Sequence, residues 1–332
     1  MRREGSPLTG LGAVLGKELA DHLSSIRMRI LELLVVLFCL APVSDLVRRI
    51  RDLPLGEDRF LFLYLFSLSA REWLYPMFQM LSIVLPVLAI GIGFDAVNAE
   101  FNRRTMSRIL AQPVYRDAVL LGKFLAGITT LGLSLLVIWL LIVGIGILAV
   151  GVPPTVEELG RSLLLMVCSL AYAGIWLAIS MLFSTLFRSG AASVLSSLGL
   201  WLLFWWGWPM VTQSIADMFM APGENINSVP ALIGFLTDRA DFEQLISRIS
   251  PATLYTEAAV GLLSPDTRTL QTSTNLLQQL IPAMRGGAIP GAPLSFFESV
   301  LLIWPHLVIM IAATILLLAI TYIIFQRQEV RA

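Results

Sequence analysis

FLAGITTLGLSLLVIWLLIVGIGILAV, residues 124–150, contains no ionisable side chain. A helix that crosses the roughly 30 Å hydrocarbon core of a bilayer needs about 20 mostly apolar residues, because all of its backbone hydrogen bonds must be made internally there. This stretch is longer than that requirement. It therefore predicts a membrane-spanning helix and, with it, an integral membrane protein.

Further apolar stretches on both sides of this segment predict additional spans. Four meet the same test, and a fifth meets it less well because Glu32 and Asp45 confine its charge-free centre. The chain is 57% hydrophobic and only 14% charged, with a mean hydropathy of +0.80, whereas soluble domains carry about 25% charged residues. We predict an all-α polytopic protein with six transmembrane helices. The five further spans are expected at Ile30 to Val47, Trp73 to Val97, Ser162 to Phe187, Ser189 to Gln213 and Ser299 to Phe325.

The residues before the first span have the periodicity of an amphipathic helix. Apolar positions recur at intervals of three or four while polar residues occupy the opposite side. This pattern predicts a helix on the membrane surface, and a second reading is that the helix also docks a cytoplasmic partner. Charged residues interrupt the region, so it is not a cleavable signal peptide. The expected apolar face holds Leu11, Leu15, Leu19, His22, Ile26 and Ile30, and the polar side holds Lys17, Asp21, Ser24 and Arg27.

The distribution of Lys and Arg predicts the orientation, because basic residues concentrate in cytoplasmic loops. With both termini inside, residues 1–29, 98–123, 188–190 and 326–332 are cytoplasmic and hold 13 basic residues in 65 positions. The outer segments 48–72, 151–161 and 214–298 then hold 10 in 121. We therefore expect cytoplasmic termini.

This orientation gives a single membrane domain over residues 1–332. A cytoplasmic amphipathic helix occupies 1–29, spans one to five occupy 30–213, span six occupies 299–325, and a cytoplasmic tail occupies 326–332. Residues 214–298 are too long for a simple connection. We expect them to form a helical extracytoplasmic cap, with helices near 241–249 and 251–263 and a Pro-Gly linker at 286–293.

Several classes of function lack the residues that they need. Lys+Arg and Asp+Glu balance at 23 each, which argues against nucleic-acid binding. The pairs Gly16-Lys17 and Gly122-Lys123 lack the earlier glycine and the following Ser or Thr of a phosphate-binding loop. With only His22 and His306, the chain has no metal-site pattern. We predict no catalytic residue, metal or cofactor in this chain, so any ATP and Mg²⁺ would be bound by a partner.

Isolated polar residues inside the spans suggest weaker hypotheses. Gly91-Ile-Gly93-Phe-Asp95 resembles part of an intramembrane aspartyl protease motif, but the second carboxylate that such chemistry needs has only Asp45 as a candidate. Glu32 and Asp95 lie near span ends, where charge is tolerated. We expect His306 to bond a carbonyl freed by Pro305. Four tryptophans, Trp201, Trp205, Trp206 and Trp208, predict an interfacial aromatic belt, with substrate contact as the alternative.

The segment FDAVNAEFNRRTMSRILAQPVYRDAVLLGKFLAG, residues 94–127, joins the second and third spans. Phe101, Met106, Ile109 and Leu110 can share one helical face, and Pro113 then ends the helix. The pattern predicts a short helix and turn across the cytoplasmic ends of two spans. Such an element could rest in the lipid headgroups or be moved by a partner.

This segment resembles the type-2 ATP-binding-cassette exporter permeases, in particular their NosY-like and GldF-like branch. That branch has D-x4-E, then G-T-(L/M), then L-(S/A)-x-P-(V/I)-x-R, and finally Gly-Lys at the third span. In this chain Arg104 replaces the usual glycine and Phe101 the usual basic residue. The matching positions are Asp95, Glu100, Thr105, Met106, Ile109, Leu110, Ala111, Pro113, Val114, Arg116, Gly122 and Lys123.

The resemblance implies a permease subunit of an ABC exporter in the inner membrane of a prokaryote. The implied partners are an ATPase subunit, a second permease subunit, identical or homologous, and membrane lipid. ATP-driven movement of the cytoplasmic helices would give alternating access. The implied coupling helix contains Glu100, Arg103, Arg104, Thr105, Arg108, Pro113 and Arg116, and the implied connecting helix contains Lys17, Glu18 and Asp21.

Two readings of the function stay open at the level of sequence. The first is export of a substrate, and the apolar spans favour lipids, hydrophobic peptides or drugs over ions. The second is a membrane transducer that transports nothing, in which the ATPase acts on an extracytoplasmic partner protein through residues 214–298.

Overall fold

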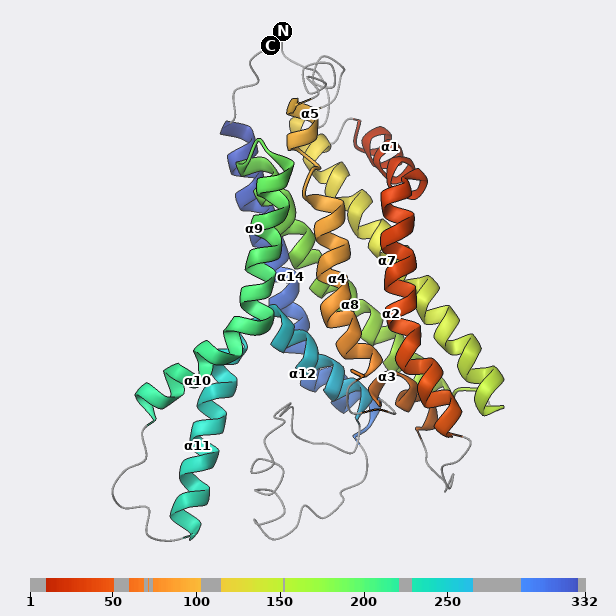
Figure 1. Cartoon of the computed structure of the whole chain (residues 1–332), viewed down its shortest axis with the longest axis vertical. Coiled ribbons are helices and arrows are strands. Elements are labelled where there is room, and N and C mark those ends of the chain that lie inside the picture. The colour runs from red at the N-terminus through yellow and green to blue at the C-terminus, as the bar shows by residue number, and fades with distance from the viewer. Residues whose placement is uncertain are drawn as a thin grey trace.

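The computed structural model describes residues 10–50, 60–68, 71, 74–102, 115–151, 153–220, 229–264 and 294–327, and these residues form helices and no strands. Six helices in this part of the chain are long and apolar enough to cross a membrane, which confirms the prediction of an all-α polytopic protein. Figure 1 shows them as a bundle of steeply inclined rods. They cover Ile26–Arg48, Met77–Asn102, Asp117–Ala149, Val156–Leu186, Gly190–Phe219 and Phe296–Arg327.

The helices extend beyond the apolar stretches because polar residues continue or cap them. Helix α7 (Arg116–Val150) begins two turns before the apolar run and ends at Gly151, whose φ of 76° lies in the left-handed region that favours glycine. Helix α8 (Val156–Leu186) begins with a capping box, in which Thr155 and Glu158 each bond the other's backbone. The starts that hydropathy predicts for the third and fourth spans therefore fall inside the helices, whereas the helix of the second span begins at Met77, later than the predicted Trp73.

The amphipathic helix ends earlier than its periodicity indicated. Helix α1 (Leu11–Ser24) stops at Ser25, whose extended backbone (φ −68°, ψ 130°) turns the chain into α2 (Ile26–Ile50). Because of this turn, Ile26 and Ile30 belong to α2 and are exposed rather than part of the α1 face. The expectation that they continue that face is wrong, since periodicity in sequence does not report a change of helix axis.

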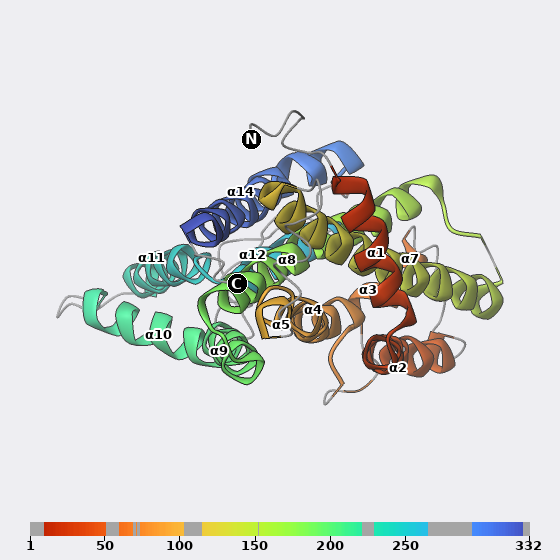
Figure 2. The ribbon, with the colours of Figure 1, turned by 90° about the horizontal axis from the view of Figure 1, so that it is seen from above.

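Helix α8 lies at the centre of the bundle, with α4 (Met77–Gly93), α7, α12 (Pro251–Leu263) and α14 (Phe296–Arg327) around it (Figure 2). Tyr172 and Trp176 of α8 are fully buried. Small residues allow close packing here: a Cβ on Gly93 of α4 would lie 2.9 Å from the Ser180 side chain. A helix that is apolar on all sides and central is expected to hold the remaining spans together.

After α9 (Gly190–Leu202) the chain widens into a π-helical turn, Leu203–Gly207, and continues as α10 (Trp208–Phe219) and α11 (Val229–Ser247). Figure 1 shows α10 and α11 extending away from the bundle. Helix α12 instead returns into it, where Tyr255 stacks on Tyr172 at 4.9 Å. The expectation of one cap over 214–298 therefore needs correction: α12 is part of the core. Residues 265–293, including the Pro-Gly linker, lie outside the described residues.

A buried polar network fixes α12 against α14. Glu257 of α12 is fully buried, and its carboxylate lies 2.6 Å from Nε2 of His306 on α14. The same carboxylate accepts hydrogen bonds from Gln244 of α11 and from Arg248, which directly follows that helix. The expected partner of His306, a carbonyl freed by Pro305, is thus replaced by a carboxylate from a distant part of the sequence.

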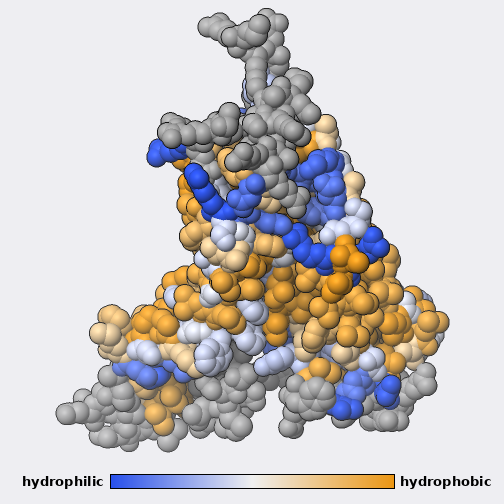
Figure 3. Space-filling model, turned by 45° about the horizontal axis from the view of Figure 1, so that its top comes forward, coloured by the Kyte–Doolittle hydropathy of each residue, from blue (hydrophilic) through white to orange (hydrophobic). Residues whose placement is uncertain are grey.

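The short elements η1 (Leu61–Leu63), α3 (Tyr64–Ser67) and α5 (Asn98–Asn102) complete the described structure. Figure 3 shows an apolar surface around the middle of the bundle and polar side chains at the end where α1 and α5 lie. We call this the α5 end and the opposite one the α12 end. The division into an apolar middle and polar ends is what a bilayer requires of a spanning protein.

Candidate functional site

Helices α1, α5 and α7 meet at the α5 end in a cluster of four charged residues: Lys17, Glu18, Glu100 and Lys123. We call this cluster the charged junction. Lys123 of α7 is 6% exposed, and its Nζ lies 2.8 Å from Oε1 of Glu18 and 3.5 Å from Oε1 of Glu100. A single lysine thus joins the N-terminal helix to the segment that follows the second span.

Lys17 completes the junction from its solvent side. Its Nζ lies 2.9 Å from Oε1 of Glu18, 3.2 Å from Asp21 and 3.8 Å from Oε1 of Glu100. Each of the two carboxylates therefore faces both lysines. This arrangement is important because a buried charge is tolerated only when it is paired and hydrogen-bonded.

Close helix packing brings the junction together. A Cβ on Gly122 would lie 2.8 Å from Cγ1 of Val14, so glycine at this position lets α1 cross directly over α7. Glu100 is placed independently through α8, because Ser184 Oγ accepts hydrogen bonds from the backbone N–H groups of Val97 and Asn98. The adjacent residues Gly122 and Lys123 thus have separate roles. Gly122 permits the close contact between α1 and α7, and Lys123 supplies the positive charge of the junction.

The electrostatics of Glu18 follow from this geometry. Burial alone would raise the pKa of Glu18, but the ion pair and hydrogen bond with Lys123, assisted by Lys17, outweigh burial, so the pKa lies below its usual value. A carboxylate whose pKa is lower in the folded state than in the unfolded state stabilises the fold above the unfolded pKa. Glu18 therefore contributes stability at neutral pH.

We expect acidification to remove this contribution. The loss should begin as the pH falls through the usual glutamate value of about 4.3 and continue as it falls through the lower pKa of the folded state. Glu18→Gln has no carboxylate to protonate, so its melting temperature should fall less than that of the wild type between pH 6 and pH 3. Thermal unfolding in detergent at several pH values measures how far the melting temperature of each protein falls. Equal falls for Glu18→Gln and the wild type would contradict the assignment.

A second ion pair lies beside the junction and joins two spans. Arg27 at the start of α2 donates hydrogen bonds of 2.8 and 3.3 Å to the carboxylate of Asp95, two residues after the end of α4. Its guanidinium lies 5.0 Å from the centre of the Phe94 ring. A polar cavity of about 380 Å³ lies between this pair and the junction. The ends of α1, α2, α4, α5 and α7 are therefore linked by charge.

The same pair rules out the aspartyl protease hypothesis. Asp45 lies near the far end of α2, where its carboxylate accepts a hydrogen bond of 3.2 Å from Arg71. Most of the length of α2 separates Asp45 from Asp95, and the two carboxylates cannot share a proton. Among the residues that the structure describes, no group of three or more His, Cys, Asp or Glu could hold a metal ion.

The junction contains Lys17, Glu18 and Glu100 of the sequence-derived site, and Asp21 lies at its edge. Arg103, Arg104, Thr105, Arg108 and Pro113 lie outside the described residues, and Arg116 begins α7. Lys123 and Arg27 had not been assigned a role in the site. The signal that could have identified Lys123 is its position as a lysine at the start of an apolar span. The sequence pattern placed Arg27 on the polar side of the amphipathic helix, but that helix ends before Arg27.

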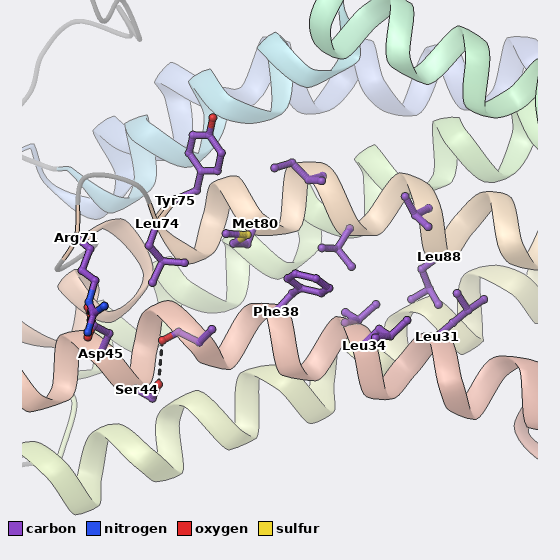
Figure 4. A pocket seen from close by; sticks show the side chains of 15 residues that line it. Leu31, Leu34, Phe38, Ser44, Asp45, Arg71, Leu74, Tyr75, Met80 and Leu88 are labelled. Carbon is purple, nitrogen blue, oxygen red and sulfur yellow. Dashed lines mark hydrogen bonds and ion pairs between the residues drawn. The ribbon is translucent and has the colours of Figure 1, made fainter.

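An apolar groove of about 800 Å³ runs between α2 and α4 (Figure 4). Leu31, Leu34 and Phe38 of α2 face Met80 and Leu88 of α4 across it, and the pair Asp45 and Arg71 lies at its α12 end. The walls of the groove are thus the two spans that Arg27 and Asp95 join at the α5 end.

A family model described as "ABC-2 family transporter protein" matches residues 12–330, almost the whole chain. No curated protein matches the sequence.

Proposed function

The chain belongs to the ABC-2 transporter family, and on this premise we propose that it is an export permease whose N-terminal helix and second-to-third span segment act as levers on α2, α4 and α7. It is a permease subunit of an ABC transporter, and the family pairs such subunits with a separate ABC ATPase. We further propose that the chain takes part in export and belongs to the NosY-like and GldF-like branch. It would lie in the inner membrane of a prokaryote, with both termini in the cytoplasm.

The observation that carries the proposal is the charged junction. Lys123 lies on α7, Glu18 on α1 and Glu100 on α5, so a push on either lever is transmitted to the start of a span. Helix α1 continues into α2 through the turn at Ser25, and α5 follows α4. An ATPase that contacts residues 100–116 would therefore move α2, α4 and α7 together rather than one at a time.

The groove between α2 and α4 gives this movement a consequence for transport. Its walls are attached to the two levers, so a change in their separation at the α5 end would change the width of the groove. Packed helices shift between discrete arrangements rather than deforming continuously. With a second permease subunit, identical or homologous, such a shift would provide alternating access for an apolar substrate.

A reversible crosslink between α2 and α4 tests the lever. Arg27→Cys and Asp95→Cys are introduced together, with Cys39 and Cys168 replaced by alanine, and the complex with its ATPase is reconstituted into vesicles. Closing the pair with a reducible bis-thiosulfonate reagent should lower ATP-driven substrate movement at least tenfold, and reduction should restore it, because the crosslink fixes the separation of the two spans. Transport of a fluorescent lipid is the first readout.

A crosslink within one helix is the matched control. Arg239→Cys with Glu243→Cys joins two positions of α11 that already form an i,i+4 ion pair, and the same reagent should leave transport as it was. Full coupled transport with positions 27 and 95 joined would overturn the lever mechanism. Failure of the purified chain to associate with any ATP-hydrolysing subunit would overturn the proposed function as a whole.

The transducer remains a second candidate because of α10 and α11. These helices extend from the bundle and expose large apolar side chains, among them Met218, Phe219 and Leu245. A partner protein could rest on such a surface. ATPase activity that responds only to an added extracytoplasmic protein, with no movement of solute or lipid, would favour this candidate over export.

A further inference from the structure

A second cavity, of about 430 Å³, lies toward the α12 end, and its wall differs in chemistry from that of the apolar groove. It is formed by the first turns of α4, the π-helical turn with the start of α10, the link between α11 and α12, and the first turns of α12. Its lining combines aromatic rings with the hydroxyl groups of serine and threonine and the amide of Gln79, and includes no Asp, Glu, Lys or Arg.

The hydroxyl groups face the cavity as hydrogen-bond acceptors. Ser82, Thr212, Ser247 and Thr256 each donate their proton to a main-chain carbonyl of their own helix, at 2.7 to 2.9 Å. A hydroxyl has one proton and two lone pairs. Once that proton is donated to the backbone, the oxygen can only accept. A ligand that bonds to these four oxygens must therefore bring hydrogen-bond donors.

The aromatic side of the cavity offers apolar ring faces and the N–H donors of three indoles. Rings of Phe204, Trp205, Trp206 and Trp208 line it. The indole N–H of Trp208 is buried and has no hydrogen-bond partner among the described residues. A buried donor without a partner is costly. The nitrogen itself is not accessible from the cavity, so a ligand could relieve that cost by supplying an acceptor only after a rotation of the indole ring exposes the N–H.

The wide turn accounts for the clustering of these rings. Leu203–Gly207 is π-helical, and such turns inside a regular helix occur frequently at functional sites. Here the carbonyl of Phe204 accepts a hydrogen bond of 3.4 Å from Ser250, at the start of α12. The irregular turn is thereby attached to the hydroxyl-bearing wall, and the aromatic and polar sides of the cavity face each other.

We propose that this cavity binds an uncharged molecule that carries hydroxyl groups next to an apolar face. Each ligand hydroxyl supplies both the donor that the wall oxygens need and the acceptor that Trp208 needs, while the apolar face packs on the indoles. A carboxylate or phosphate would meet lone pairs and the negative faces of the rings without a cation. A quaternary ammonium ion would suit the rings but would leave the Trp208 donor unsatisfied.

The claim that this cavity holds the transported compound rests on the proposed function. The claim that it binds a ligand does not. Binding can be measured on the permease chain alone, without an ATPase. Loss of transport with binding intact would count against the proposed export function, whereas absence of binding would count against the cavity.

The test uses three amphiphiles with the same octyl chain and different headgroups. The full chain in phosphatidylcholine nanodiscs is photolabelled with an octyl glucoside that carries a diazirine, and labelled peptides are identified by mass spectrometry. We expect labels on α4, α10 and α12. Unlabelled octyl glucoside should compete at least tenfold better than octyl sulfate or octyltrimethylammonium. Better competition by either charged compound, or labels spread evenly over all spans, would overturn the proposal.

Two variants with matched controls locate the site. Thr256→Val should weaken competition by octyl glucoside about fivefold, as expected for one lost hydrogen bond, whereas Thr129→Val, which removes an equivalent back-bonded hydroxyl from α7, should not. Trp206→Leu should reduce labelling, and Trp304→Leu, at a similarly exposed tryptophan of α14, should leave it unchanged. If each variant behaves like its control, the cavity is not the binding site.

Discussion

Lys123→Met is expected to destabilise the folded protein by about 4 kcal/mol and to abolish ATP-coupled turnover. Methionine fills a similar volume but removes the buried cation, so that Glu18 and Glu100 keep only the more exposed Lys17 as their shared cation. Removing one partner of a buried ion pair typically costs about 3 to 5 kcal/mol, because the remaining charge is uncompensated. The junction would then separate, and α1 and α5 would lose their common attachment to α7.

Thermal unfolding of the purified chain measures the first effect, and ATPase activity of the reconstituted complex measures the second. Lys17→Met removes the same charge from a side chain that is 56% exposed, so its cost should stay below about 1 kcal/mol. Lys123→Met combined with Glu18→Gln should recover part of the lost stability. If Lys123→Met is no more harmful than Lys17→Met, the junction does not join the helices.

Arg161→Met is expected to cost about 5 kcal/mol and to release α12 from the bundle. Arg161 is fully buried and donates hydrogen bonds to the carbonyls of Leu262 and Leu294, to Ser299 and to Glu157 at 2.6 to 3.1 Å. These groups belong to the start of α8, the end of α12 and the approach to α14. Without the guanidinium, two carbonyls and a carboxylate lose their donor, at about 1 to 3 kcal/mol for each unsatisfied group.

Unfolding in detergent measures the stability, and limited proteolysis reports whether α12 becomes accessible. Arg161→Lys should recover only part of the loss, because an ammonium group cannot reproduce the planar set of donors. Arg239→Met serves as the control, since Arg239 lies on α11 in a partly exposed pairing with Asp217 and Glu243, and it should cost less than about 1 kcal/mol. Protection of α12 in Arg161→Met would contradict this role.

Hydropathy predicted the spans because crossing a bilayer is a local requirement. Each span must carry about 20 apolar residues of its own, so a stretch such as 124–150 is recognisable without knowledge of its neighbours. The ends of the helices were harder to predict from the sequence, because they depend on caps and turns. Thr155 and Glu158 extend α8 beyond its apolar run, and the single extended residue Ser25 divides what the periodicity indicated was one helix.

The candidate site was predicted in part. Glu18, Lys17 and Glu100 were identified through a resemblance between sequences, and the structure brings them together around Lys123. The pairing itself could not be predicted, because Lys123 and Glu18 are 105 positions apart and no local pattern relates them. The course of α12 escaped prediction for the same reason: Glu257 meets His306 from another helix, 49 positions away.

The sequence by itself determined that this is a membrane protein, how often it crosses the bilayer and which family it belongs to. Apolar length and a local motif carry that information within a few dozen consecutive residues. Only the tertiary structure decided which charges are paired, which helices form the walls of the groove and the cavity, and that α12 lies in the core. Buried charges and hydroxyl groups depend for their partners on helices far apart in the chain, and those partners exist only once the helices have packed.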